Sequence, residues 1–171
     1  MKQFFPYSKQ IIRHFKEPRN MGKIKNPDAI GEAGNLVCGD VMRLYLKIEE
    51  KRGKKIIKDI KFETFGCIVA IANSSMLTTM VKGKTLEEVM KIKKEDLIKK
   101  LGKPLPPFKI HCSILAIDAL HEALYNYYLK KKLPIPEELK KEHERIKKTL
   151  SEIEGKHKEF VEMERKLLEK G

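Results

Sequence analysis

Residues 41–65, with the sequence VMRLYLKIEEKRGKKIIKDIKFETF, decide the fold. Apolar and polar side chains alternate from Val41 to Ile48, which is the period of a strand with one buried face. Residues 55–65 alternate in the same way, and Gly53 lies between the two stretches at a turn position. Two alternating strands with a short connection predict an antiparallel hairpin.

Helical patterns lie on both sides of this hairpin, so the chain is of the α+β class. Ser8 is a capping residue for a short helix over 9–16, whereas 23–37 is rich in turn residues and reads as a loop with room for one short strand. Further helices are predicted at 68–82, from a capping box at Thr85, at 95–101 and from His111 to about Lys132, and the proline-rich stretch 103–107 is predicted to be extended.

The C-terminal part of the chain, 133–171, is predicted to be a charged helical extension of a domain over 1–132. A break at Leu133-Pro134-Ile135-Pro136 precedes it. Three arrangements stay open: a self-associating coiled coil, a helix packed back on the domain, and a partly frayed tail. A coiled coil needs two apolar positions in every seven residues. The second of these positions is poor here, because it holds His143, Leu150, His157 and Glu164. Apolar residues recur every seven positions along this stretch, at Leu139, Ile146, Ile153, Phe160 and Leu167.

Charge alone invites a nucleic-acid interpretation, because 37 Lys and Arg face 24 Asp and Glu for a net charge of +13. The distribution argues against it. Residues 134–171 are electrically balanced, so 1–133 carry the whole excess, and the lysines there are scattered through amphipathic segments. We therefore expect a solvated lysine-rich surface and no nucleic-acid partner. A basic docking face for an acidic protein is the alternative.

The three cysteines suit a reducing compartment, because an odd number at wide spacing is a poor disulfide framework. No apolar stretch near the N-terminus has the length of a signal peptide, and no segment has the length of a membrane span. We expect a cytoplasmic protein with no membrane association.

Ligand-type residues lie at the junctions between predicted elements. Cys38 and Asp40 precede a strand, Cys67 lies between a strand and a helix, and Cys112 follows His111 at a helix start. A helix N-terminus favours the thiolate, which is the form that binds metal and attacks sulfur. The alternative is that each cysteine is a small core residue. Together the five residues predict a zinc or iron–sulfur site, with Asp40 or His111 as the fourth ligand.

The chain closely resembles the IscU-type iron–sulfur cluster assembly scaffolds, also called NifU N-terminal-like proteins. The matching stretches follow the family's order and spacing over about residues 5–131. They are PRNMG (18–22), CGDVM (38–42), TFGC (64–67), AIANSS (70–75), VKGK (81–84), LPPFK (105–109) and IHCSILA (110–116).

The resemblance implies a scaffold that takes sulfur as persulfide from a cysteine desulfurase, gathers iron, builds a [2Fe–2S] cluster and transfers it to apo-proteins. Cys38, Cys67 and Cys112 are then the cluster cysteines, and Cys112 is the persulfide acceptor. Asp40 is associated with cluster lability and is a candidate ligand. His111 is a metal ligand in zinc- or iron-loaded forms, so zinc is a candidate in the isolated protein.

The resemblance also implies a fold and further partners. The fold is SufE/NifU-like, a small three-stranded antiparallel sheet with helices packed on one face, and the protein is a carrier rather than an enzyme. An iron donor is a further expected partner, and the C-terminal extension favours a homo-oligomer as one option. Hsp70-type chaperones bind a motif like Leu105, Pro106, Pro107, Phe108 and Lys109, although Phe108 replaces the usual valine.

A zinc-dependent sulfur acceptor of the SufU type is the closest alternative. Proteins of that type carry an insertion between the second and third cysteines and lack the histidine before the third. This chain has His111 and a short connection from Cys67 to Cys112, which favours the scaffold. Ile68 and Val69 are bulkier than the residues that usually follow the second cysteine, and they either shield the cluster from water or pack a helix.

Overall fold

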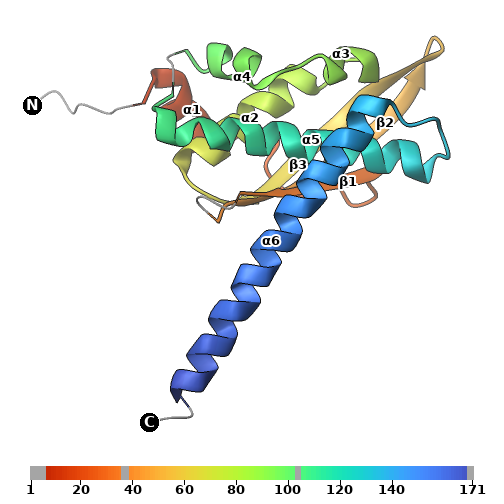
Figure 1. Cartoon of the computed structure of the whole chain (residues 1–171). Coiled ribbons are helices and arrows are strands. Elements are labelled where there is room, and N and C mark those ends of the chain that lie inside the picture. Colours follow the sequence, from red (N-terminus) through yellow and green to blue (C-terminus); the bar gives the residue numbers. More distant parts are fainter. Residues whose placement is uncertain (1–6, 36–38, 103–104, 169–171) are drawn as a thin grey trace, which may run out of the picture.

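The computed structural model describes residues 7–35, 39–102 and 105–168, and its arrangement is shown in Figure 1. A three-stranded antiparallel sheet carries helices on one face, as the resemblance predicted. In chain order the elements are α1 (Lys9–Lys16), β1 (Ala29–Gly34), β2 (Val41–Lys51), β3 (Lys54–Phe65), α2 (Ile68–Val81), α3 (Leu86–Met90), α4 (Lys94–Lys100), the 3-10 helix η1 (Pro107–Lys109), α5 (Ile110–Lys130) and α6 (Glu137–Leu168).

The predicted hairpin is confirmed, and it is longer than the alternating sequence alone indicated. β2 and β3 pair antiparallel from Val41↔Phe65 at one end to Lys51↔Lys54 at the other. Gly53 is in the turn, as expected, with a positive φ of 72°. Leu44 and its pairing partner Phe62 are fully buried, because their shared face of the sheet is the one that the helices cover.

Residues 23–37, predicted as a loop with room for one short strand, contain strand β1. β1 pairs antiparallel with β2 at the edge of the sheet, in the order β1-β2-β3. Its small residues serve a close approach of α5: a Cβ placed on Gly31 would lie 2.2 Å from the carbonyl oxygen of Ala119 and 2.2 Å from the backbone nitrogen of Ala123. Only glycine leaves room for the helix backbone at this distance.

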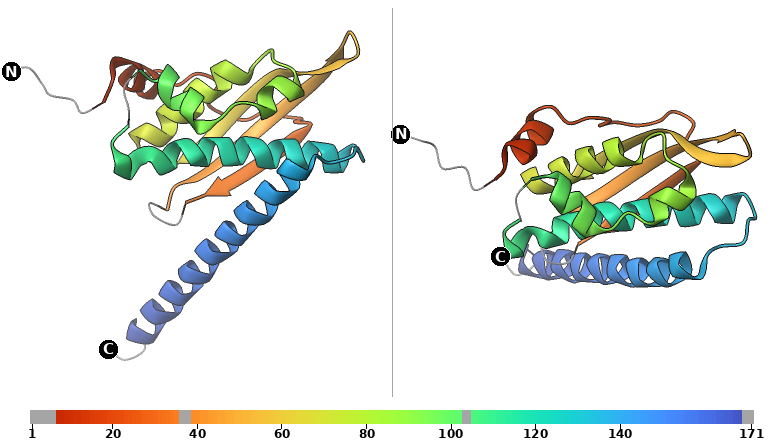
Figure 2. Two further views of the ribbon diagram at one scale, coloured as in Figure 1. Left: turned by 45° about the horizontal axis from the view of Figure 1, so that its top comes forward. Right: turned by 90° about the horizontal axis from the view of Figure 1, so that it is seen from above.

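The two longest helices of the domain, α2 and α5, lie side by side on this face of the sheet (Figure 2). The predicted caps are confirmed. Ser8 accepts a hydrogen bond from the Ile11 backbone at 3.2 Å, and Thr85 and Glu88 form the capping box. The expectation that Pro107 is extended was wrong: it begins a 3-10 turn, where a missing backbone N–H costs nothing.

The C-terminal helix α6 packs on the domain with its first half only. Leu139 and Ile146 are each 2% exposed, and the helix lies against α5 and the edge strand β1. Its second half extends away from the sheet (Figure 1). Covering β1 also protects the backbone of an edge strand from pairing with other chains. No helix among the described residues is both long and apolar enough to cross a membrane.

Candidate metal centre

The sheet register brings two of the predicted ligands together. Asp40 comes just before β2 and Cys67 just after β3. Because Val41 pairs with Phe65, the two residues lie at the same end of the β2–β3 hairpin. The Cys67 backbone N–H donates a hydrogen bond to the Asp40 carboxylate at 3.4 Å. Gly66 keeps the two close, since a Cβ there would lie 3.2 Å from Asp40 Cγ.

Cys112 completes the group from the first turn of α5. Its Sγ lies 3.7 Å from the Sγ of Cys67, and the ligand atoms of these two residues and Asp40 are all within 4.8 Å of one another. Two thiolates on one tetrahedral metal at about 2.3 Å would have their sulfurs about 3.8 Å apart. The spacing of the two sulfurs therefore fits a shared tetrahedral metal ion.

Cys67 is held in its thiolate form. A hydrogen bond from Cys112, together with the backbone N–H groups of Ala70 and Val69 in the first turn of α2, lowers the pKa of Cys67 to about 5. Burial and the neighbouring negative charge of Asp40 act in the opposite direction but are outweighed. A cysteine that is ionised at neutral pH and half-exposed is ready to bind a metal ion.

Lys109 is the residue of this site that sequence reasoning missed as a charge partner. Burial alone would lower the pKa of its ammonium, but attraction to Cys67 and Cys112 and a hydrogen bond to Cys67 outweigh that effect and raise the pKa. The family resemblance assigned Lys109 to the chaperone motif. Its position in the turn directly before His111 and Cys112 was the available signal.

One of the other two predicted ligands, His111, is not part of this group. Cys38 lies outside the described residues. Asn35, which precedes it in the chain, donates its backbone N–H to the carbonyl of Asp40, which follows it, at 3.0 Å. His111 is half-buried. Among the described residues, its ring nitrogens are not part of the set of ligand atoms that all lie within 4.8 Å of one another. Its Nε2 is buried without a hydrogen-bond partner. Such a nitrogen is suited to a ligand that arrives later.

Buried polar contacts fix the helices that carry the cysteines. The Ser113 hydroxyl, on α5, donates to the Asn73 side-chain oxygen on α2 at 2.7 Å, and both residues are fully buried. This bond ties the two helices together next to Cys112. Val69 is also fully buried, which favours helix packing as the reason for its bulk.

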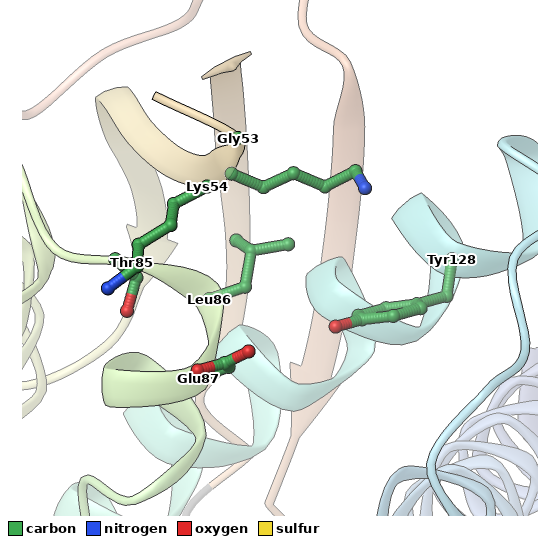
Figure 3. Close-up of a pocket in the computed structure, with 7 residues that line it drawn as sticks. Gly53, Lys54, Thr85, Leu86, Glu87 and Tyr128 are labelled. Atoms are coloured by element: carbon green, nitrogen blue, oxygen red, sulfur yellow. The ribbon is translucent and has the colours of Figure 1, made fainter. Parts of the chain in front are cut away.

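The surface beside the site is apolar at the sheet edge. Phe65 is 86% exposed and Val41 is 41% exposed, and together with Glu32, Arg43, Glu63 and Thr64 they line a groove of about 320 Å³. A second, smaller pocket of about 160 Å³ lies at the far end of the hairpin (Figure 3). Lys54 begins β3 and Tyr128 lies near the end of α5, whereas Cys67 follows the end of β3 and Cys112 lies in the first turn of α5, so that pocket is remote from both cysteines.

The stretch predicted to bind a chaperone is only partly accessible. Leu105 is 5% exposed, and Lys109 faces the thiolates. The side chain of Phe108 lies outside the described residues.

Comparison with known proteins agrees with this geometry. The family model of the NifU-like N terminal domain matches residues 6–134. The iron-sulfur cluster assembly scaffold protein IscU 1 of Archaeoglobus fulgidus is 48% identical over 142 residues, which cover 79% of this chain and 90% of that protein. The scaffold protein IscU of Escherichia coli K12 is 45% identical over 128 residues, which cover 73% of this chain and 96% of that protein.

Solved structures show the same fold. A putative iron-sulfur cluster assembly scaffold protein for the SUF system from Fervidobacterium islandicum AW-1 superimposes with a TM-score of 0.58 at 27% identity, over 69% of this chain and 96% of that one. The N-terminal NifU-like protein of Brucella abortus does so with a TM-score of 0.56 at 18% identity, over 72% and 94%. The chain thus belongs to the NifU-like N-terminal domain family, together with the IscU scaffolds of iron–sulfur cluster assembly.

Proposed function

We propose that this protein is a scaffold on which iron and persulfide-derived sulfur are assembled into a [2Fe–2S] cluster that is then passed to apo-proteins. The cluster is cargo, held by Cys38, Cys67 and Cys112 with Asp40 or His111 as the fourth ligand. The relatives are named as scaffold proteins, and we propose that this chain likewise has no turnover of its own.

One observation carries the proposal: the ligand atoms of Asp40, Cys67 and Cys112 lie within 4.8 Å of one another. A mixed thiolate and carboxylate set also suits temporary binding. A carboxylate is a harder and weaker ligand for iron in a sulfur cluster than a thiolate is. Asp40 is therefore the bond that opens first when the cluster leaves.

The sulfur enters as a persulfide on a desulfurase cysteine. In the proposed step Cys112 passes its proton to the Cys67 thiolate along their hydrogen bond, and the Cys112 thiolate so formed attacks the outer sulfur of that persulfide. A new S–S bond forms on Cys112, the S–S bond of the donor breaks with its electron pair, and the donor cysteine leaves as a thiolate. The transferred sulfur must be reduced before it becomes sulfide, so a reductant is a further reactant.

Lys109 supports this step electrostatically. Its ammonium lies against the thiolates, where it stabilises negative charge on sulfur. Cys112 is fully buried, so the transfer requires that η1 and the start of α5 move apart from Cys67 when the desulfurase binds. Mapping the added sulfur by mass spectrometry tests the assignment. Persulfide on Cys67 in the Cys112→Ser variant, at the rate of the unchanged protein, would overturn it.

Anaerobic reconstitution with iron, cysteine and a cysteine desulfurase tests the function itself. We expect the visible absorption of a [2Fe–2S] cluster and one cluster's iron and sulfide per site. Cys→Ser at position 38, 67 or 112 should remove or sharply weaken the signal. A normal cluster in the triple Cys→Ser variant would contradict the proposal.

The zinc-dependent sulfur acceptor is the competing function, since the sulfur spacing also fits zinc. The two are separated by metal content and by persulfide transfer. A protein that needs bound zinc to accept sulfur, and that never holds an iron–sulfur chromophore, would be the acceptor. We expect instead that iron and sulfide displace zinc from the site.

Partners are proposed from the same site. The groove with Phe65 and Val41 is a docking place for the desulfurase, an iron donor or a recipient apo-protein. Apolar surface that stays exposed to water is unfavourable, and beside a reactive thiolate it marks a place that a partner protein covers. Binding of an Hsp70-type chaperone to Leu105–Lys109 is proposed after release of the buried Leu105. A reducing compartment such as the cytoplasm keeps low-pKa thiolates of this kind from being oxidised, so a cytoplasmic location is proposed.

A further inference from the structure

The second half of α6 projects from the domain with its apolar side chains exposed. The helix is 32 residues long, or about 48 Å at 1.5 Å per residue. Its last close contact with the domain is at Gly34, where an added Cβ would lie 2.8 Å from Ile153 Cδ1. From residue 154 to 166 every side chain whose exposure is described is exposed. The left view in Figure 2 shows this half extending away from α5 toward the C-terminus.

This projecting half carries apolar side chains. Phe160 is 60% exposed, Val161 48% and Met163 55%. Phe160 continues the seven-residue spacing of Leu139 and Ile146, the two residues that bury the first half of the helix. The stripe that packs on the domain thus runs on into solvent. A free helix of about 15 residues is marginal in water, so this segment is expected to depend on a partner.

The charges around Phe160 specify the partner's orientation. Lys156 and Lys158 precede Phe160 by four and two residues, and Glu162 and Glu164 follow it by two and four. If two copies cross antiparallel at Phe160, each lysine lies at the level of a glutamate of the other copy. In a parallel pair each lysine would lie at the level of the same lysine. Opposite charges at one level are favourable and like charges are not.

We propose that residues 154–166 form an antiparallel pair with the same segment of a second copy, centred on Phe160. The contact is isologous, so positions equally far before and after Phe160 meet across the two copies. Residues 134–171 are electrically neutral while 1–133 carry +13. An antiparallel pair places the two basic domains at opposite ends of the contact, where they repel each other least.

Sedimentation equilibrium of the full chain over a concentration series tests this pairing. We expect a reversible dimer that Phe160→Glu weakens roughly tenfold or more, as for a central aromatic contact. The matched control is Leu129→Glu, which makes the same change at an apolar residue 56% exposed on α5. The control should remain dimeric. A monomer at every concentration, or an unchanged dimer in Phe160→Glu, overturns the proposal.

A charge exchange tests the orientation. Lys156→Glu with Lys158→Glu should weaken the dimer, and adding Glu162→Lys with Glu164→Lys should restore it. A parallel pair would give no such rescue, so its absence overturns the antiparallel arrangement. The triple Cys→Ser variant should dimerise as the unchanged protein does. Loss of the dimer in that variant would assign it to a shared cluster and overturn the helix pairing.

Discussion

The carboxylate of Asp118, on α5, accepts two hydrogen bonds from the guanidinium of Arg145 on α6, at 3.1 and 2.5 Å. Asp118 is only 7% exposed, so this bidentate pair anchors the start of α6 to the domain. Next to it His143 contacts Glu122 at 2.7 Å and stacks on Tyr125, with ring centroids 3.8 Å apart. The docking of α6 is thus polar as well as apolar.

Arg145→Ala should destabilise the fold by about 1–3 kcal/mol, because it leaves a buried carboxylate without its charge partner. Burial already raises the pKa of Asp118 in spite of Arg145, and the variant raises it further. A raised carboxylate pKa lowers stability as the pH rises. Urea unfolding should therefore show a larger loss at pH 7 than at about pH 4. Lys148→Ala, on the exposed side of α6, is the control; an equal loss there would contradict the role of the pair.

Gly31→Ala should cost about 3 kcal/mol or more, because the added methyl group would overlap the backbone of α5 at Ala119 and Ala123. Gly155→Ala is the matched control, since beyond its chain neighbours and the backbone of its own helix nothing lies within 4 Å of its added Cβ. It should leave stability unchanged or raise it by up to about 1 kcal/mol through helix propensity. Thermal unfolding followed by circular dichroism measures both. Equal melting temperatures for the two variants would refute the close approach of α5.

The rate at which iodoacetamide alkylates Cys67 should rise with an inflection near pH 5, where this thiol ionises. The usual value is 9.0, so the folded pKa is depressed. The stability that the thiolate supplies is complete above pH 9 and is lost as the pH falls through 5. Cys112→Ala removes the donor hydrogen bond and should move the inflection to higher pH. Peptide mass spectrometry gives the rate at each cysteine, and an inflection near pH 9 in the unchanged protein would contradict the thiolate.

Asp40→Ala should give a longer-lived cluster. The carboxylate is the weakest ligand of the proposed set, so its removal deletes the bond at which the cluster opens first. The measurement is the decay of cluster absorbance in the presence of an iron chelator. Asp59→Ala removes a carboxylate within β3, away from the cysteines, and should leave the lifetime unchanged. An equal or faster decay for Asp40→Ala would count against its role in release.

Local pattern predicted the elements whose residues carry a strong period or a cap. Alternation located β2 and β3, and the capping residues Ser8 and Thr85 located α1 and α3. β1 was visible only as turn-rich sequence, because its small residues are explained by the approach of α5 and not by strand propensity. Contact with a distant helix cannot be read from the strand itself.

The site was predictable where its residues lie at junctions between elements. Asp40, Cys67 and Cys112 are brought together, as their junction positions indicated. His111 lies outside that group because of the direction in which its ring points from the first turn of α5. Its position in the sequence does not predict that direction. The contact of Lys109 with Cys67 depends in the same way on the 3-10 turn at Pro107. The role of Cys38 remains a prediction.

The 3.7 Å between the sulfurs of Cys67 and Cys112 has a cost for the unloaded protein. A disulfide needs its sulfurs about 2.05 Å apart, so a small shift is enough for the pair to close. A thiolate next to a thiol is the state in which oxidants produce such a bond. The arrangement that receives iron and sulfur therefore also makes the empty protein sensitive to air. Any occupant that binds both sulfurs protects the scaffold from inactivation between rounds of assembly.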